Sequence, residues 1–149
     1  IIEYLDQFAA RPPLIPKDAN DALQVRLWDR LVDSYVPEPM QDIVLDHLRG
    51  AKGDTSSLRA TIQTAYGLLD SQLAPRPWLA GQTFSMADCA AAPALFYAHT
   101  LEAFPEHLVH LRTYFDLLME RPSVQRVLTE AQPYFPMYPF YSAIPARFL

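Results

Sequence analysis

The feature that most constrains the fold lies at residues 84–96, where a helix start signal leads into a helix with almost no polar face. Ser85 and Asp88 have the spacing of a capping box, in which the serine hydroxyl accepts from the Asp88 N–H and the carboxylate accepts from the Ser85 N–H. Phe84 and Cys89 occupy the two positions of a hydrophobic staple. Because a helix that is apolar all round belongs in a core, the chain is predicted to fold around a central helix beginning at Ser85.

The composition is that of a globular domain, with 149 residues of which 50% are hydrophobic and 19% charged. The net charge of −5 and the scattered basic residues argue against a nucleic-acid partner. The longest apolar run, around Pro93, is too short to cross a bilayer, and the chain starts without the features of a signal peptide. One cysteine excludes an internal disulfide and fits a reducing compartment, so we expect a cytoplasmic protein with no membrane partner.

An all-α fold is predicted, because neither strand alternation nor hairpin turn signals are found. Apolar periodicity predicts helices over 18–35, 40–48 and 54–73, the first two separated by the prolines at 37 and 39. Two further helices are expected to open at Phe104 and at Pro122, which gives a bundle of about five or six helices. The helix at 18–35 has two apolar lines, so both of its faces are candidates for burial. These lines are Leu23, Leu27, Leu31 and Tyr35, and Val25, Trp28 and Val32.

Four segments are expected along the chain. Residues 1–10 open on apolar side chains without an N-cap, as the end of a helix that starts earlier would do. Residues 11–17 form a proline-rich linker, and residues 18–132 form the helical domain. Residues 133–149 are rich in proline and aromatic side chains, so we expect an irregular tail that packs on the domain.

Several motifs in this order resemble the C-terminal helical domain of cytosolic, bacterial-type glutathione S-transferases. The sequence from Trp78-Leu79-Ala80-Gly81 through Phe84-Ser85-Met86-Ala87-Asp88-Cys89-Ala90 is similar to the loop, capping box and staple of that family. The segment 26–40 is similar to the long helix of bacterial members. Arg121-Pro122-Ser123 resembles the turn before the family's short last helix. The resemblance implies the helical bundle of that domain over nearly the whole chain.

The resemblance also implies what the chain lacks. Residues 1–10 are similar to the end of the last helix of the family's thioredoxin-like domain, which is otherwise absent from the chain. In the family, that domain binds glutathione and carries the catalytic Tyr, Ser or Cys. We therefore expect no catalytic residue and no bound cofactor in this chain, with glutathione as the co-substrate of a longer parent protein. The missing domain and a second copy of the chain are the partners that the family implies.

The family role implied for this domain is to hold an apolar electrophile and to dimerise, so the chain alone is expected to be inactive. A transferase is the favoured activity of the parent. A non-catalytic interaction module or ligand carrier of the same fold stays open, as do other glutathione-dependent reactions: isomerisation, dehalogenation and disulfide reduction. The physiological substrate is left open.

The electrophile pocket should be apolar and aromatic with few polar groups. Tyr35 and Met40 are the first candidates because they flank the proline break at the expected cleft. The full set of candidates is Tyr35, Met40, Tyr97, Tyr134, Phe135 and Tyr138. Because an aromatic side chain at helical spacing is more often a core residue than a ligand contact, burial in the core stays the alternative for each of them.

Other reactive residue types are interpreted as structural. Capping explains the spacing of Ser85 and Asp88, and the staple position makes Cys89 a small buried hydrophobe rather than a nucleophile. No metal site is predicted, because only two histidines are expected to share a helix face and no further ligand completes a set. The four histidines are His47, His99, His107 and His110. Arg26, Asp29, Arg30 and Asp33 are spaced to form ion pairs on a solvated helix face, the alternative being a face toward the cleft.

Overall fold

The computed structural model describes residues 1–8 and 12–149, and these residues form an all-α domain, as predicted. The helices are α1 (Ile2–Asp6), α2 (Ala19–Tyr35), α3 (Pro37–Leu48), α4 (Ser56–Leu73), α5 (Met86–Leu101), α6 (Val109–Glu120) and α7 (Pro122–Ala131). Three short 3₁₀ helices end the chain, at Gln132–Met137, Tyr141–Ala143 and Ala146–Phe148. Within the described residues, the only strand-like pairing is a single bridge between Trp78 and Gly81.

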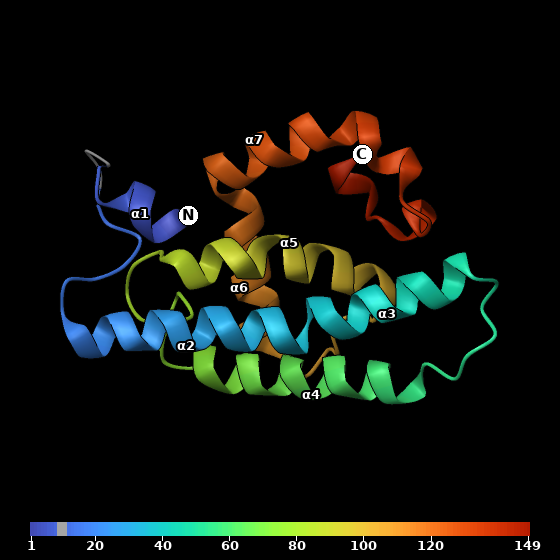
Figure 1. The fold of residues 1–149 in the computed structure, drawn as a ribbon, viewed down its shortest axis with the longest axis horizontal. Coiled ribbons are helices and arrows are strands. Elements are labelled where there is room, and N and C mark those ends of the chain that lie inside the picture. The colour runs from blue at the N-terminus through green and yellow to red at the C-terminus, as the bar shows by residue number, and fades with distance from the viewer. Residues whose placement is uncertain (9–11) are drawn as a thin grey trace.

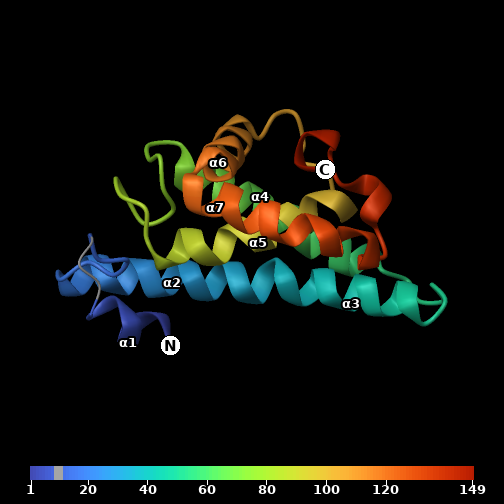
Figure 2. The same ribbon diagram turned by 90° about the horizontal axis from the view of Figure 1, so that it is seen from above.

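Helix α5 lies in the middle of the bundle, with α2 and α3 along one side and α7 on the other (Figure 1). Helices α2 and α3 follow each other along nearly one line over the length of the molecule (Figure 2). Ala87, Ala91, Leu95 and Ala98 of α5 are fully buried. Because alanine projects only a methyl group, these positions let the neighbouring helices approach the α5 backbone closely. The predicted central helix is therefore the core of the fold.

The start of α5 is fixed by the buried carboxylate of Asp88. Its Oδ2 accepts from the Ser85 N–H at 2.8 Å, which is the predicted back-bond, and from the Ser85 hydroxyl at 2.9 Å. Its Oδ1 accepts from the Leu79 N–H at 3.0 Å and from the Tyr114 hydroxyl at 2.7 Å. Burial and the nearby carboxylate raise the pKa of Tyr114 well above its usual value, so this phenol stays a neutral donor. One carboxylate thereby ties the loop before α5 to both α5 and α6.

Only one of the two apolar lines of α2 is buried. Val25, Trp28 and Val32 pack in the core, whereas Leu23 and Tyr35 are 60% and 50% exposed. Within this chain, therefore, only one of the two candidate faces is covered. The prediction that helix resumes at Met40 is corrected, because α3 begins at Pro37. Proline is tolerated at the first position of a helix, where its missing N–H would have no partner in any case.

Helix α6 begins at Val109 and not at Phe104 as predicted. The carboxylate of Asp70, on α4, accepts from the N–H groups of His110 and Leu111 at 2.9 Å each. The cap therefore comes from another helix, which no local sequence pattern indicates. As a result His107 precedes the helix, and the expectation that it shares a face with His110 is wrong.

The N-terminal segment contacts α2 and the loop that leads to it. Arg26 forms a bidentate ion pair with Glu3, at 2.8 and 3.0 Å, in place of the predicted pairing with Asp29. The Asp6 carboxylate accepts from the N–H groups of Leu14 and Ile15. Residues 9–11 lie outside the described residues, so the expected boundary between residues 1–10 and 11–17 cannot be placed.

The tail folds back onto the helices through its apolar side chains. Phe135, Ile144 and Phe148 are buried against the domain. The amide of Gln132 donates to the Phe148 carbonyl at 3.1 Å, and Arg147 pairs with Asp116 of α6 at 2.7 Å. The short 3₁₀ helices replace the irregular chain that the prolines suggested. Phe135 is thereby held close to α5.

Candidate binding site

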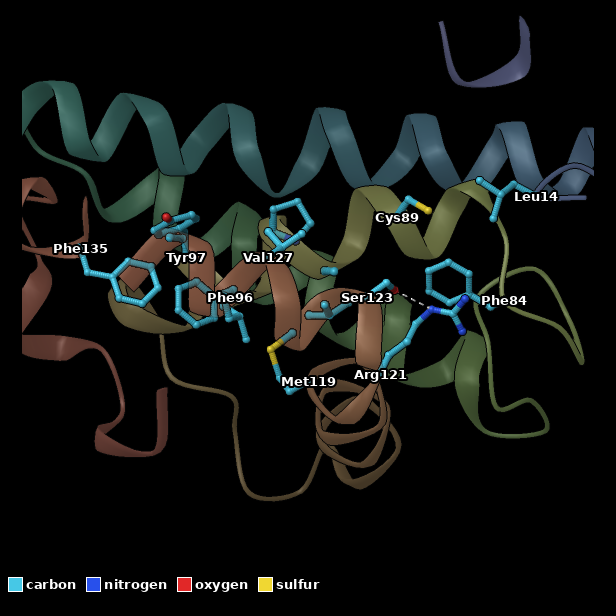
Figure 3. A pocket seen from close by; sticks show the side chains of 15 residues that line it. Leu14, Phe84, Cys89, Phe96, Tyr97, Met119, Arg121, Ser123, Val127 and Phe135 are labelled. Atoms are coloured by element: carbon cyan, nitrogen blue, oxygen red, sulfur yellow. Dashed lines mark hydrogen bonds between the residues drawn. The ribbon is translucent and has the colours of Figure 1, made fainter. Parts of the chain in front are cut away.

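An apolar groove lies between α5 and α7, with a volume of about 390 Å³ (Figure 3). This volume is within the range of roughly 300–1,000 Å³ that is usual for small-molecule sites. One wall comes from α5, and its residues are Cys89, Ala92, Pro93, Phe96 and Tyr97. The other comes mainly from α7, and its residues are Ser123, Val124, Val127, Leu128 and Ala131. Leu14, Phe84, Met119, Arg121 and Phe135 complete the lining.

The groove exists because α7 has an apolar face that only partly packs against the bundle. Val127 is 60% exposed although it faces α5 across the groove. On the α5 side, Pro93 sits inside the helix and is exposed at the groove wall. Proline cannot donate a helix hydrogen bond, so its usual place is a helix end or a functional kink. Both walls therefore present apolar surface that the described residues do not cover.

One end of the groove carries a single cationic side chain. The guanidinium carbon of Arg121 lies 3.6 Å from the ring centroid of Phe84, which is a cation–π contact. Its Nε donates to the hydroxyl of Ser123 at 3.1 Å. The ring and the hydroxyl thus fix the plane of the guanidinium at the mouth of the groove (Figure 3).

The opposite end of the groove is aromatic. The ring of Phe96 stacks on Phe135, with centroids 5.6 Å apart, and meets Tyr97 edge-on at 5.1 Å. Tyr138, from the tail, meets Tyr97 at 5.0 Å, and its hydroxyl hydrogen-bonds to Thr100 at 2.8 Å. Burial raises the pKa of both Tyr97 and Tyr138 above the usual value, so both phenols are neutral at pH 7. The phenols at this end of the groove can therefore donate a hydrogen bond, but they do not carry a negative charge.

The six predicted pocket residues are not all brought together. Tyr97 and Phe135 line the groove. Tyr138 does not line it, but its ring packs against that of Tyr97. Tyr35 instead lines a separate hollow between α2 and α4, together with Leu31 and Leu68. Met40 packs against the core, and Tyr134 is 67% exposed without lining the groove.

Sequence reasoning missed the cationic end of the groove and the whole α7 wall. Phe84 appeared only as a staple residue, and Arg121 only as part of a turn. An available signal was the apolar stripe formed by Val124, Val127 and Leu128. That stripe follows the Arg121-Pro122 pair directly, and the sequence does not show which other segment would pack against it.

One of the reactive side chains considered in the sequence lies at the groove. Cys89, the staple residue, was expected to be buried. It is instead only partly buried, and it lies at the groove wall. His99 lies outside the groove, accepting from the Phe104 N–H through Nδ1 at 3.2 Å.

Within residues 1–8 and 12–149, no three His, Cys, Asp or Glu side chains are grouped so as to hold a metal ion. No helix in that part of the chain has the length and apolarity required to cross a membrane.

Comparison with known proteins places this geometry in context. The family model described as "Glutathione S-transferase, C-terminal domain" matches residues 21–130. Glutathione S-transferase 2 of Saccharomyces cerevisiae is 25% identical over 139 residues, covering 86% of this chain and 59% of that protein. FtsZ-localized protein A of Caulobacter vibrioides is 27% identical over 146 residues, covering 89% of this chain and 63% of that protein.

Solved structures show the same fold. A glutathione S-transferase of Methylobacillus flagellatus, solved with glutathione bound, superposes with a TM-score of 0.74 at 25% identity. The superposition covers 83% of this chain and 64% of that one. The present chain therefore spans about six-tenths of the length of these three proteins.

Proposed function

Because the chain belongs to the glutathione S-transferase C-terminal domain family, we propose that it is the electrophile-binding part of a glutathione-dependent transferase. The observation that carries this proposal is the apolar groove between α5 and α7, which has an aromatic end and few polar groups. A site of this kind binds an apolar small molecule and orients it through its few polar groups. Tyr97 and Phe135 are the two predicted pocket residues that this proposal retains.

In the proposed reaction, the glutathione thiolate attacks an electrophilic carbon of a molecule held in the groove. A C–S bond forms, and the bond from that carbon to its leaving group breaks, as when a chlorinated nitrobenzene releases chloride. The thiolate is the nucleophile, so the main chemical requirement is a group that lowers the pKa of the glutathione thiol. In our proposal that group, and the glutathione site itself, belong to a thioredoxin-like domain outside residues 1–149. Residues 18–132 and the tail then serve to bind and place the electrophile.

We further propose that the parent is a cytoplasmic homodimer. Support comes from the exposed apolar side chains on the α2 and α4 face, where Tyr35 is 50% and Leu68 48% exposed beside the hollow between these helices. Exposed apolar surface of this kind is typical of protein–protein contacts. The face lies away from α7, so a second copy bound there leaves the groove between α5 and α7 open (Figure 1).

The proposal is tested by assaying the chain with glutathione and a chlorinated nitrobenzene, alone and as the full-length parent. We expect turnover only with the parent, because our proposal assigns the group that activates the thiol to the thioredoxin-like domain. Retention of the parent on immobilised glutathione should accompany that turnover. Conjugation by residues 1–149 alone would contradict the proposal that thiol activation belongs to a separate thioredoxin-like domain.

A second candidate function is a non-catalytic interaction module. The observation in its favour is that FtsZ-localized protein A matches the chain at 27% identity, as well as the transferases do. In that case the groove would accept an apolar segment of a protein partner. A parent that neither binds glutathione nor turns over electrophiles would favour this function over the transferase.

A further inference from the structure

The second half of the tail, residues 138–149, is attached to the helices through side chains. Each backbone hydrogen bond that this segment donates ends on another residue of the tail. Its last residues are held by the burial of Ile144 and Phe148 and by the ion pair between Arg147 and Asp116 of α6. A segment attached in this way opens at a lower free energy than a helix in the core does.

His99, on α5, shares a neighbour with the end of the tail. The ring centroid of Phe115, on α6, lies 5.7 Å from that of His99 and 5.8 Å from the guanidinium carbon of Arg147. The ring of Phe148 meets the same Phe115 ring edge-on at 6.2 Å. The imidazole is therefore packed against the cluster that holds residues 144–149.

The observed contacts of His99 require a neutral imidazole. Nδ1 accepts from the N–H of Phe104 at 3.2 Å, so this nitrogen carries no proton. In the imidazolium form both ring nitrogens are donors, so protonation would set two N–H groups against each other. Burial is the first cause that lowers the pKa of His99, and the charges of Arg147 and Arg112 act in the same direction, against Asp116.

The charges around His99 connect its protonation to the tail. They are Arg112 and Asp116 of α6, Arg147 of the tail, and the Arg59–Glu102 pair that joins α4 to the end of α5. Asp116 is the carboxylate that pairs with Arg147. A protonated His99 would add another cation beside this carboxylate, repelling Arg147 and weakening the ion pair of the tail.

We propose that His99 is a pH-sensitive switch for the tail: the neutral imidazole holds residues 144–149 on α5 and α6, and its protonation releases them. Attachment is fully stabilised above pH 6.5, the usual pKa, and weakens as the pH falls through the lower pKa of the attached state. Release would also loosen the aromatic end of the groove, because Phe148 packs on Phe96 at 5.3 Å. The inference goes beyond the proposed function, since it requires no ligand in the groove.

Backbone order measured by NMR relaxation tests this switch in the chain itself. At pH 7.5 the amide order parameters of Ile144 and Arg147 should lie near the value of about 0.85 that is usual for a rigid backbone. At pH 5 they should fall toward the values below about 0.6 that mark a flexible segment. The order parameters of α5 should stay unchanged, because the helix remains folded.

Two variants make the test specific. His99→Gln retains an oxygen that can accept from the Phe104 N–H but takes up no proton, so the order of residues 144–149 should be the same at both pH values. His47→Gln is the matched control. His47 is exposed on α3, and its ring lies 4.6 Å from that of Phe140 in the same tail, so release should be unchanged in this variant.

The unmodified protein decides the question even if His99→Gln fails to fold. In a pH titration, the chemical shift of the His99 ring proton and the order parameter of Arg147 should change with the same midpoint. Separate midpoints, a tail whose order does not change with pH, or release that persists in His99→Gln would each overturn the inference. Loss of order in α5 together with the tail would overturn it as well, because acid would then unfold the domain instead of releasing the tail.

Discussion

Asp88 is the single residue on which the start of the central helix depends most. Its carboxylate is fully buried and accepts from Leu79, Ser85 and Tyr114. Asp88→Asn replaces one acceptor oxygen by an NH₂ group, which faces donors and leaves them unpaired. We expect a loss of about 3 kcal/mol in the free energy of unfolding, measured by urea denaturation.

Asp116→Asn is the matched control for this substitution. The Asp116 side chain is 53% exposed and pairs with Arg147 at the surface, so its loss should change stability by less than about 1 kcal/mol. Equal effects of the two substitutions would show that the Asp88 hydrogen bonds do not determine the start of α5.

His99 gives the fold a dependence on pH. Burial is the main cause that lowers its pKa from the usual 6.5, and the charges of Arg147 and Arg112 act in the same direction, against Asp116. The unfolded chain therefore takes up a proton at a higher pH than the folded protein does. The contribution of neutral His99 is fully present above pH 6.5 and decreases as the pH falls below that value.

Urea denaturation between pH 5 and pH 7.5 measures this dependence. The slope of unfolding free energy against pH should be smaller in His99→Gln than in the unmodified protein. Parallel slopes in the two proteins would refute the assignment to His99. The other three histidines are present in both proteins, so the difference between the slopes isolates His99.

Among the helices, α5 is the one whose sequence contains an internal conflict. Pro93 lies eight positions into the helix, where proline is about 3 kcal/mol less favourable than alanine. Pro93→Ala should therefore stabilise the protein, by about 1–3 kcal/mol in urea denaturation. Pro122→Ala is the control, because Pro122 opens α7 at a position that tolerates proline, and its replacement should have a much smaller effect. A destabilised Pro93→Ala variant would show that the proline ring is required for packing.

The helices that could be predicted from the sequence are those whose signals are local. The Ser85–Asp88 cap and the apolar run after it predicted α5, and the stripe ending at Leu73 predicted α4. The start of α6 could not be predicted, because its cap is supplied by Asp70 from another helix. Tyr35 was a pocket candidate because it flanks the proline break at the end of the long helix, but the side of α2 on which it lies depends on packing. Two apolar lines on one helix do not reveal which of them is buried.

In the molecule as a whole, the α5–α7 groove and the α2–α4 face are apolar surfaces that the described residues leave uncovered. We assign the second to dimerisation, so Leu68→Arg should convert a dimer into a monomer in analytical ultracentrifugation. The matched control is Val109→Arg, on α6, because Val109 is 55% exposed, close to the 48% of Leu68, and lies outside the hollow between α2 and α4. A dimer that survives Leu68→Arg would contradict this assignment.

We propose that the groove between α5 and α7 holds an apolar ligand, and the most direct test is to fill the groove with a larger side chain. Val127→Trp adds a large ring at the α7 wall, where the valine is 60% exposed and its replacement disturbs no core contact. Val109→Trp adds the same ring outside the groove. Calorimetric titration with 6-phenylhexan-1-ol should show binding to the unmodified chain and to Val109→Trp but none to Val127→Trp. Unchanged binding to Val127→Trp would contradict the account.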